Sequence, residues 1–177
     1  MKAAKSYIAV CLLLLLTITG CKETETVISD NDFYENISRA LVDCYISIYN
    51  QNVAGYPEGA VDKTVNGPLG GTVHITGNVT SGGGTTSTDL LLSLTNVSYV
   101  YAYGYWSISL VLTGDVTYNG SFSGSYVSVN HQSSNLNMQG TVQYKQTTRS
   151  VANLGAVSIN RTTSGTTAVI FGHAVAY

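Results

Sequence analysis

The sequence predicts a mainly β fold of the α+β class, in which one N-terminal amphipathic helix packs on a long, coiled antiparallel β-sheet that is sandwich-like or a partial barrel. Two periodicities carry this prediction. Between Asp30 and about Asn52, apolar residues recur at helical spacing, whereas the later chain alternates with a period of two and is rich in Thr, Val, Tyr and Gly. We expect residues 30–177 to form a single domain, because this length is typical of one.

The first 21 residues have the features of a leader that ends at an attachment site. Lys2 and Lys5 precede an apolar run from Tyr7 to Leu16, and Ile18-Thr19-Gly20-Cys21 follows it. A short positive region, an apolar core and a small-residue exit are typical of a secretory signal peptide. The run is shorter than the ~20 residues that a membrane-spanning helix needs. In sequence, residues 18–21 resemble the lipobox of bacterial lipoproteins, which is an apolar residue, a small or hydroxyl residue, Gly or Ala, and then Cys.

This resemblance implies how the mature chain is held. In the lipoprotein family, cleavage occurs before the Cys and a diacylglyceryl group is attached to its thiol. We therefore expect residues 1–20 to be a signal peptide and residues 21–29 to be a polar tether that begins at lipidated Cys21. More than one acyl chain gives stable anchoring, so the membrane is an expected partner. Lys22 stands where Asp would retain some lipoproteins at the inner membrane, which favours the outer membrane of the bacterial cell envelope.

Cysteine usage leaves the mature fold without an internal disulfide. Cys11 is removed with the leader and Cys21 carries the lipid, so only Cys44 remains. We expect Cys44 to pack as a small hydrophobe on the helix; a reactive or intermolecular thiol is the alternative.

The predicted helix has a continuous apolar face and clear end signals. Its apolar residues recur at spacings of four, four, three and four: Phe33, Ile37, Leu41, Cys44 and Ile48. Capping oxygens are available at 29–32, and Gly55 and Pro57 end the pattern. A second stripe (Val42, Ile46, Tyr49 and Val53) widens the apolar face, so we expect the C-terminal half of the helix to be the more deeply buried.

Three predicted strand segments share one pattern, in which the apolar face contains a central glycine. They lie at 73–79, 110–118 and 136–144, with the glycines at Gly77, Gly114 and Gly140. Glycine weakens a strand and needs a reason. Either the helix approaches closely at these positions, or the sheet bends sharply there. Leu92, Leu94 and Val97 look like a fourth copy whose phase slips near Asn96, as a β-bulge would produce.

Two glycine-containing stretches predict chain reversals. The run Ser81-Gly82-Gly83-Gly84-Thr85 is typical of a flexible hairpin turn. At Asn119-Gly120 we expect a three-residue loop, Tyr118 to Gly120, because it would pair Val116 with Phe122 and keep one face apolar.

The Tyr-rich segment 99–106 is the candidate binding surface. Strand alternation predicts that Tyr99, Tyr101, Tyr103 and Tyr105 share one face and that Trp106 lies on the other. Such rings stack on sugars or line protein contacts. A half-buried sheet face, where Tyr is also favoured, is the competing structural interpretation.

Composition and spacing argue against catalysis, cofactors, metal ions and nucleic acid. His74, His131 and His173 have no partner at metal-ligand spacing, and Asp89 and Asp115 are the only acids after Asp62. Removing Lys2 and Lys5 with the leader leaves six Lys and Arg against ten Asp and Glu, a net charge of −4. No basic stripe supports binding to nucleic acid.

We therefore expect a lipid-anchored envelope protein with a non-enzymatic structural or interaction role, and with an envelope protein or a glycan as its partner. The alternative is a ligand-binding module that uses the Tyr-rich face or a sheet-lined cavity to hold a glycan or a small apolar ligand.

Overall fold

The computed structural model describes residues 27–124 and 126–177. The predicted signal peptide, Cys21 and the tether up to residue 26 lie outside the described residues. In the described chain, helix α2 (Asp30–Asn52) packs on an eight-stranded sheet whose neighbouring strands are all antiparallel. Strand order follows the sequence from β1 to β8, and these two edge strands are not paired, so the sheet is not closed. The predicted fold class is confirmed.

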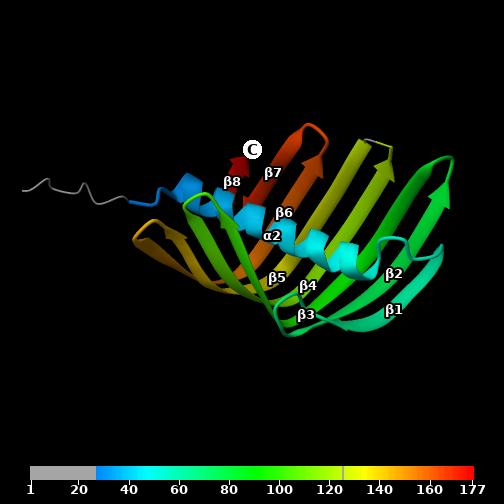
Figure 1. Cartoon of the computed structure of the whole chain (residues 1–177), viewed down its shortest axis with the longest axis horizontal. Coiled ribbons are helices and arrows are strands. Elements are labelled where there is room, and N and C mark those ends of the chain that lie inside the picture. Colours follow the sequence, from blue (N-terminus) through cyan, green and yellow to red (C-terminus); the bar gives the residue numbers. More distant parts are fainter. Residues whose placement is uncertain (1–26, 125) are drawn as a thin grey trace, which may run out of the picture.

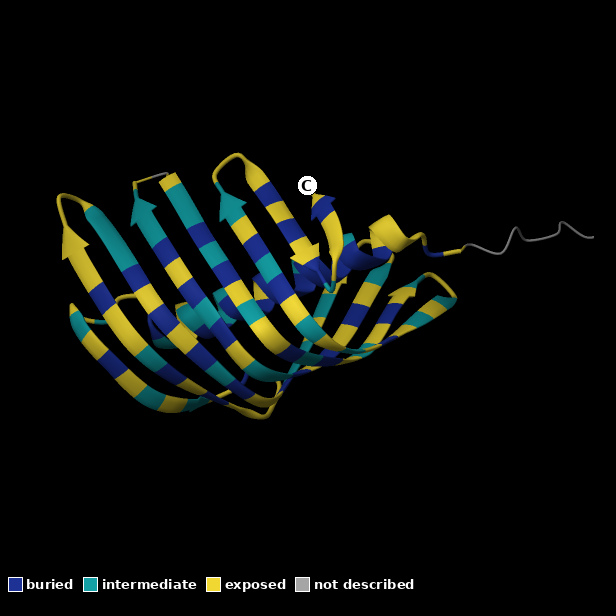
Figure 2. Ribbon diagram, turned by 180° about the vertical axis from the view of Figure 1, so that it is seen from behind, coloured by how far each residue is buried: buried dark blue, intermediate teal, exposed yellow. Residues whose placement is uncertain are grey.

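The strands lengthen towards the middle of the sheet and shorten towards its end. They are β1 (Gly59–Asn66), β2 (Thr72–Gly82), β3 (Thr85–Tyr103), β4 (Trp106–Ser123), β5 (Tyr126–Tyr144), β6 (Thr147–Thr162), β7 (Gly165–Ile170) and β8 (His173–Ala176). The sheet coils, and α2 lies across its concave side (Figure 1). Buried residues alternate with exposed ones along the strands and form one cluster with α2 (Figure 2).

Helix α2 begins and ends at the predicted signals. Ser29 is the N-cap, and its Oγ accepts a hydrogen bond from the Asp32 amide at 3.1 Å. This bond satisfies one of the amide groups that a helix start leaves unpaired. After the helix, the chain turns at Gly55 with φ +76°. All five residues of the predicted apolar face are buried.

The prediction that the C-terminal half of α2 is the more deeply buried is wrong. Asn36 and Ser38 in the first half are buried along with its apolar residues, whereas Ile46 and Tyr49 are only half-buried. Tyr177, which follows β8, contacts this first half of the helix at Ser38 and Arg39.

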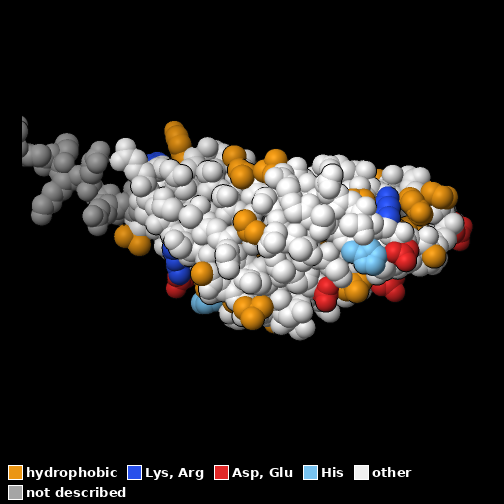
Figure 3. Space-filling view, turned by 90° about the horizontal axis from the view of Figure 1, so that it is seen from below, with side chains coloured by type: hydrophobic (Ala, Val, Ile, Leu, Met, Phe, Trp, Pro, Cys, Tyr) orange, Lys and Arg blue, Asp and Glu red, His pale blue; other side chains and the backbone are white. Residues whose placement is uncertain are grey.

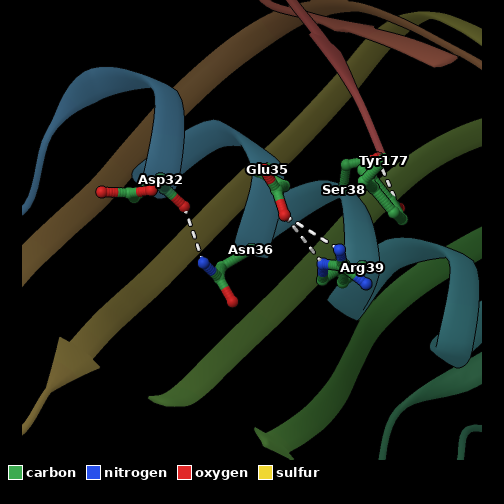
Figure 4. A network of polar contacts seen from close by, with 6 residues as sticks. All are labelled: Asp32, Glu35, Asn36, Ser38, Arg39 and Tyr177. Carbon is green, nitrogen blue, oxygen red and sulfur yellow. Dashed lines mark hydrogen bonds and ion pairs between the residues drawn. The ribbon is translucent and has the colours of Figure 1, made fainter. Parts of the chain in front are cut away.

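Tyr177 fastens this half of α2 to the sheet. Its hydroxyl lies 3.1 Å from Ser38 Oγ, and the Arg39 guanidinium stacks 3.9 Å from its ring centroid (Figure 4). Arg39 is itself paired with Glu35 at 2.9 Å. The Tyr177 backbone exchanges two hydrogen bonds with Thr166 of β7, so the ring is held by the sheet.

The strand glycines are explained by the sheet and not by the helix. Gly77, Gly114 and Gly140 all have positive φ, between +133° and +153°. At each of them the three atoms closest to an added Cβ belong to the backbone of a neighbouring strand, and none belongs to α2. The close approach of the helix is therefore the wrong explanation. Backbone that only glycine adopts easily, in β2, β4 and β5, fits a sharply bending sheet.

The predicted bulge at Asn96 is confirmed, and a second bulge lies on β5. Pairing of β3 with β4 shifts between Leu94 and Val97, and Asn96 has φ +51°. Pairing of β5 with β4 and with β6 also shifts, and with β6 the shift falls between Ser133 and Leu136. An extra residue moves the buried side chains of β5 from odd to even positions, because side chains alternate between faces.

Of the two predicted hairpins, the glycine run is confirmed and the Asn119-Gly120 loop is wrong. Gly83 and Gly84, both with positive φ, join β2 to β3. In contrast, β4 continues to Ser123, and Gly120 pairs with Val129 of β5. An added Cβ at Gly120 would lie 2.7 Å from the Phe122 ring. Gly120 therefore makes room for a side chain, and the reversal comes later, where Gly124 has φ +54°.

Candidate functional site

The four predicted ligand-facing tyrosines divide into two pairs. Tyr99 and Tyr101 lie on β3 and are half-buried against the core. The Tyr99 hydroxyl donates a hydrogen bond to Asp43 Oδ2 of α2 at 2.5 Å. Burial, then this bond and the Asp43 charge, raise the pKa of Tyr99. For this pair the structure supports the structural interpretation, because the rings and the Tyr99 hydroxyl are engaged with the fold.

Tyr103 and Tyr105 are exposed at 67% and 73%. Tyr103 is the last residue of β3, and Tyr105 lies in the turn that follows it, so Tyr105 does not share the predicted strand face. The placement of Trp106 on the opposite face is also wrong. Trp106 pairs directly with Tyr103, and paired residues of antiparallel strands point to the same face. The two-residue turn at Gly104, which has φ +58°, causes this change of phase.

A second turn completes a cluster that the sequence did not predict. Trp106 pairs with Tyr144, the last residue of β5, and their ring centroids lie 4.5 Å apart. The rings of Tyr105 and Tyr144 meet edge to face at 6.5 Å. The Lys145 ammonium lies 5.5 Å and 5.3 Å from the centroids of these two rings. We call Tyr103, Tyr105, Trp106, Tyr144 and Lys145 the aromatic tip.

Backbone bonds hold the two turns of the aromatic tip together. The Lys145 amide donates a hydrogen bond to the Tyr105 carbonyl at 3.2 Å. Gln143 Nε2 donates to the Lys145 carbonyl at 2.9 Å, within the β5–β6 turn. The backbone of the two turns is therefore held in place, which reduces the ordering of backbone that binding would require.

The aromatic tip lies at the end of the sheet where α2 begins. The β3–β4 turn in green and the β5–β6 turn in orange both reach this end, on the left of Figure 1. Arg149, near the start of β6, joins the two regions: its Nη1 lies 2.6 Å from Asp30 Oδ1 and its guanidinium stacks on Phe33. Val27, the first described residue, is 81% exposed.

An open groove of about 630 Å³ crosses the convex side of the sheet near the β5 bulge, among Leu91, Asp115, Thr117, Asn135 and Val169. Figure 3 shows the molecule from below, where most of the surface is uncharged and polar and hydrophobic side chains are scattered. The concave side of the sheet is occupied by α2. The groove is shallow and lacks an enclosing wall, so the aromatic tip is the stronger candidate.

The three histidines lie in three different environments. His74 lies on the surface of β2, and its Nε2 is 2.8 Å from Asp62 Oδ1 of β1, a pairing that sequence spacing did not indicate. His173 stacks on Tyr34 at 3.9 Å. His131 is 1% exposed, between the rings of Tyr45 and Tyr118. Burial, and then the nearby Arg161 charge, lower the pKa of His131 to about 3, so it is neutral at pH 7.

The remaining reactive groups are separated or buried. Asp89 pairs with Asn119, whereas Asp115 pairs with Ser93, which places the two carboxylates four residues, or ~13 Å, apart along the strands. Cys44 is fully buried, and burial raises the pKa of its thiol to about 12. The described part of the chain contains no group of three or more His, Cys, Asp and Glu residues that is suited to a metal ion.

No described helix combines the length and the apolar character needed to cross a membrane.

No protein-family model, curated protein or solved structure matches this chain. The geometry of the aromatic tip is therefore the main structural indication of function. Its Tyr144 and Lys145 were missed because their approach to Trp106 depends on the register of β4 with β5. The only sequence signal is the polar stretch after Tyr144, which is typical of a turn.

Proposed function

We propose that this protein is a lipid-anchored, non-enzymatic interaction protein of the bacterial cell envelope, held by Cys21 and favouring the outer membrane. The lipobox-like residues 18–21 support the anchor. The observation that best supports an interaction role is the exposure of Tyr103 and Tyr105 on the β3–β4 hairpin, which a backbone hydrogen bond joins to the β5–β6 turn. Exposed rings on a rigid support are typical of contact surfaces.

The rest of the fold supports the same proposal. Helix α2 fills the concave side of the sheet, which argues against a carrier that holds an apolar ligand there. The distance between Asp89 and Asp115 and the burial of Cys44 argue against acid–base or thiol catalysis at these residues. The described fold is therefore suited to interactions through its exposed surface, and the aromatic tip is the most distinctive part of that surface.

Glycan binding is the alternative, and the exposed Tyr103 and Tyr105 rings favour it, because aromatic rings stack on sugars. The sheet-lined cavity that we considered from the sequence is not favoured, because α2 occupies the concave side of the sheet.

The test is to fractionate bacteria that produce the wild-type chain or Cys21→Ala, and then to digest intact and permeabilised cells with protease. We expect the wild type in the membrane fraction and the variant to be displaced from it. Loss from intact cells would place the domain on the surface, and protection until permeabilisation would place it in the periplasm. Wild-type protein in the soluble fraction would contradict the proposal.

A further inference from the structure

We propose that the aromatic tip rests on the bilayer in which Cys21 is anchored, so that the protein contacts its membrane twice, by lipid and by side chains. This inference rests on the lipid anchor of the proposed function. It assigns the partner of the aromatic tip: the headgroup region of a lipid bilayer.

The composition of the aromatic tip fits that region. Tyr and Trp have a large apolar ring with one polar atom, and they are enriched where a membrane meets water. Lys complements them, because its long chain follows apolar surface while the ammonium stays in water. Here the Lys145 ammonium lies near the rings of Tyr105 and Tyr144, and the two most exposed rings, Tyr103 and Tyr105, belong to the β3–β4 hairpin.

The length of the tether places the aromatic tip near the membrane. Six residue steps separate Cys21 from Val27, and a chain of this length spans at most about 20 Å. Val27 precedes α2, whose first residue, Asp30, contacts Arg149 near the base of the aromatic tip. The end of the molecule that carries the tip is thus the end that the anchor draws to the bilayer.

The opposite end of the sheet is held away. β3 contains 19 residues, and an extended strand of that length spans up to roughly 60 Å. The β4–β5 turn lies at the far end of these long strands (Figure 1), and the exposed Tyr126 is the first residue of β5 directly after it. An anchored molecule can therefore rest on its aromatic tip while Tyr126 stays in water.

The local charges also complement a membrane surface. No ion pair joins Lys145 to a carboxylate among the described residues. Among the acids in the first half of α2, Asp30 pairs with Arg149 and Glu35 pairs with Arg39, whereas Asp32 accepts a hydrogen bond from Ser29 Oγ. Anionic headgroups attract a lysine in this position, although the mature chain has a net charge of −4.

The ring geometry favours a bilayer over a sugar. A sugar stacks on a flat face, whereas the rings of Tyr105 and Tyr144 are inclined by 82° and those of Trp106 and Tyr144 by 32°. The cluster therefore offers no extended flat platform. An uneven group of rings is well suited to a fluid interface, which adapts to its shape.

Trp106 provides a direct test, because it is the only tryptophan in the chain. The full lipidated protein is reconstituted into vesicles of phosphatidylethanolamine and phosphatidylglycerol, with and without lipids that carry a nitroxide quencher near the headgroup. Lipidation at Cys21 is first verified by mass. We expect the quencher-bearing lipids to reduce Trp106 fluorescence.

The double variant Tyr103→Ser and Tyr105→Ser removes the two exposed rings, and Tyr126→Ser is the matched control at the far end of the sheet. We expect the double variant to lose most of the lipid-dependent quenching and the control to keep it, with circular dichroism unchanged in both. Absent quenching in verified lipidated protein, or equal quenching in all variants, would overturn the proposal. The proposal would also be overturned if glycan fragments protected Trp106 from a water-soluble quencher while the quencher-bearing lipids left its fluorescence unchanged. A chain without lipid at Cys21 would instead refute the anchor.

Discussion

Gly114 offers the sharpest test of why the strands contain glycine. It lies in the middle of β4 with φ +133°, and a Cβ added there would lie 2.7 Å from the Asn135 carbonyl oxygen. A carbon and an oxygen cannot approach so closely without movement of the β5 backbone at its bulge. The Gly114→Ala substitution adds this one carbon and little else.

Two costs combine in Gly114→Ala. A non-glycine residue in this backbone region costs ~1 to 3 kcal/mol, and overpacking against a neighbouring strand costs a similar amount. Since part of the clash is relieved as the backbone moves, we expect a loss of ~2 to 4 kcal/mol in the free energy of unfolding. For a domain of this size, that loss lowers the melting temperature by ~5 to 15 °C.

The matched control is Gly82→Ala, at the end of β2. Gly82 has no positive φ, and its added Cβ meets no atom within 4 Å. This substitution should leave stability unchanged or raise it by up to ~1 kcal/mol, because alanine restricts the unfolded chain. Both variants are measured by urea unfolding followed by circular dichroism. Equal stability of the two variants would refute the explanation by strand bending and close strand contact.

Three further perturbations test the helix, the core and the Tyr177 contact. Ser29→Ala removes the cap of α2 and should cost ~1 kcal/mol in urea unfolding; an unchanged midpoint would show that the hydrogen bond to Asp32 adds nothing. Below pH 6.5 the unfolded chain gains a proton at His131, while the folded chain stays neutral down to its pKa of about 3. The free energy of unfolding should therefore fall by ~2 kcal/mol between pH 7.5 and pH 5, and His131→Leu should reduce this pH dependence. An equal pH dependence in both proteins would contradict the buried, neutral state of His131. Tyr177→Phe should lower the free energy of unfolding by ~1 kcal/mol, because the hydroxyl loses its hydrogen bond. Tyr177→Ala also loses the stacking with Arg39 and should lower it clearly more. Equal losses in the two variants would show that the ring does not contribute to stability.

Much of the fold could be predicted from local pattern. The apolar spacing and Ser29 define α2, because a helix needs a buried face and partners for its first amide groups. Period-two alternation defines the strands, and the phase slip at Asn96 locates a bulge. These features depend on neighbouring residues, so the sequence displays them directly.

The incorrect predictions concern features that are set by contacts between residues far apart in the sequence. Asn119-Gly120 is a strong hairpin signal, yet Gly120 stays within β4, where it pairs with Thr88 of β3 and Val129 of β5. The depth of α2 was misjudged because Tyr177 reaches it from the other end of the chain. The strand pairing and the Tyr177 contact both join residues that are far apart in the sequence, and local periodicity does not encode them.

The aromatic tip could be predicted only in part. The Tyr-rich segment correctly indicated Tyr103 and Tyr105 as candidate surface residues. The prediction for Trp106 was wrong because it assumed that strand alternation continues through residues 104 and 105, which form a turn. The bulges on β3 and β5 set which residues of neighbouring strands meet. The contact of Trp106 with Tyr144 follows from that register, which no single stretch of sequence specifies.

The most direct test of the proposed anchor is the mass of the N-terminal peptide from protein purified out of bacterial membranes. We predict that the mature chain begins at Cys21 and that this residue carries the added mass of a diacylglyceryl group. A chain that retains residues 1–20, or one whose Cys21 carries no lipid, would contradict the anchor and with it the placement of the aromatic tip on the bilayer.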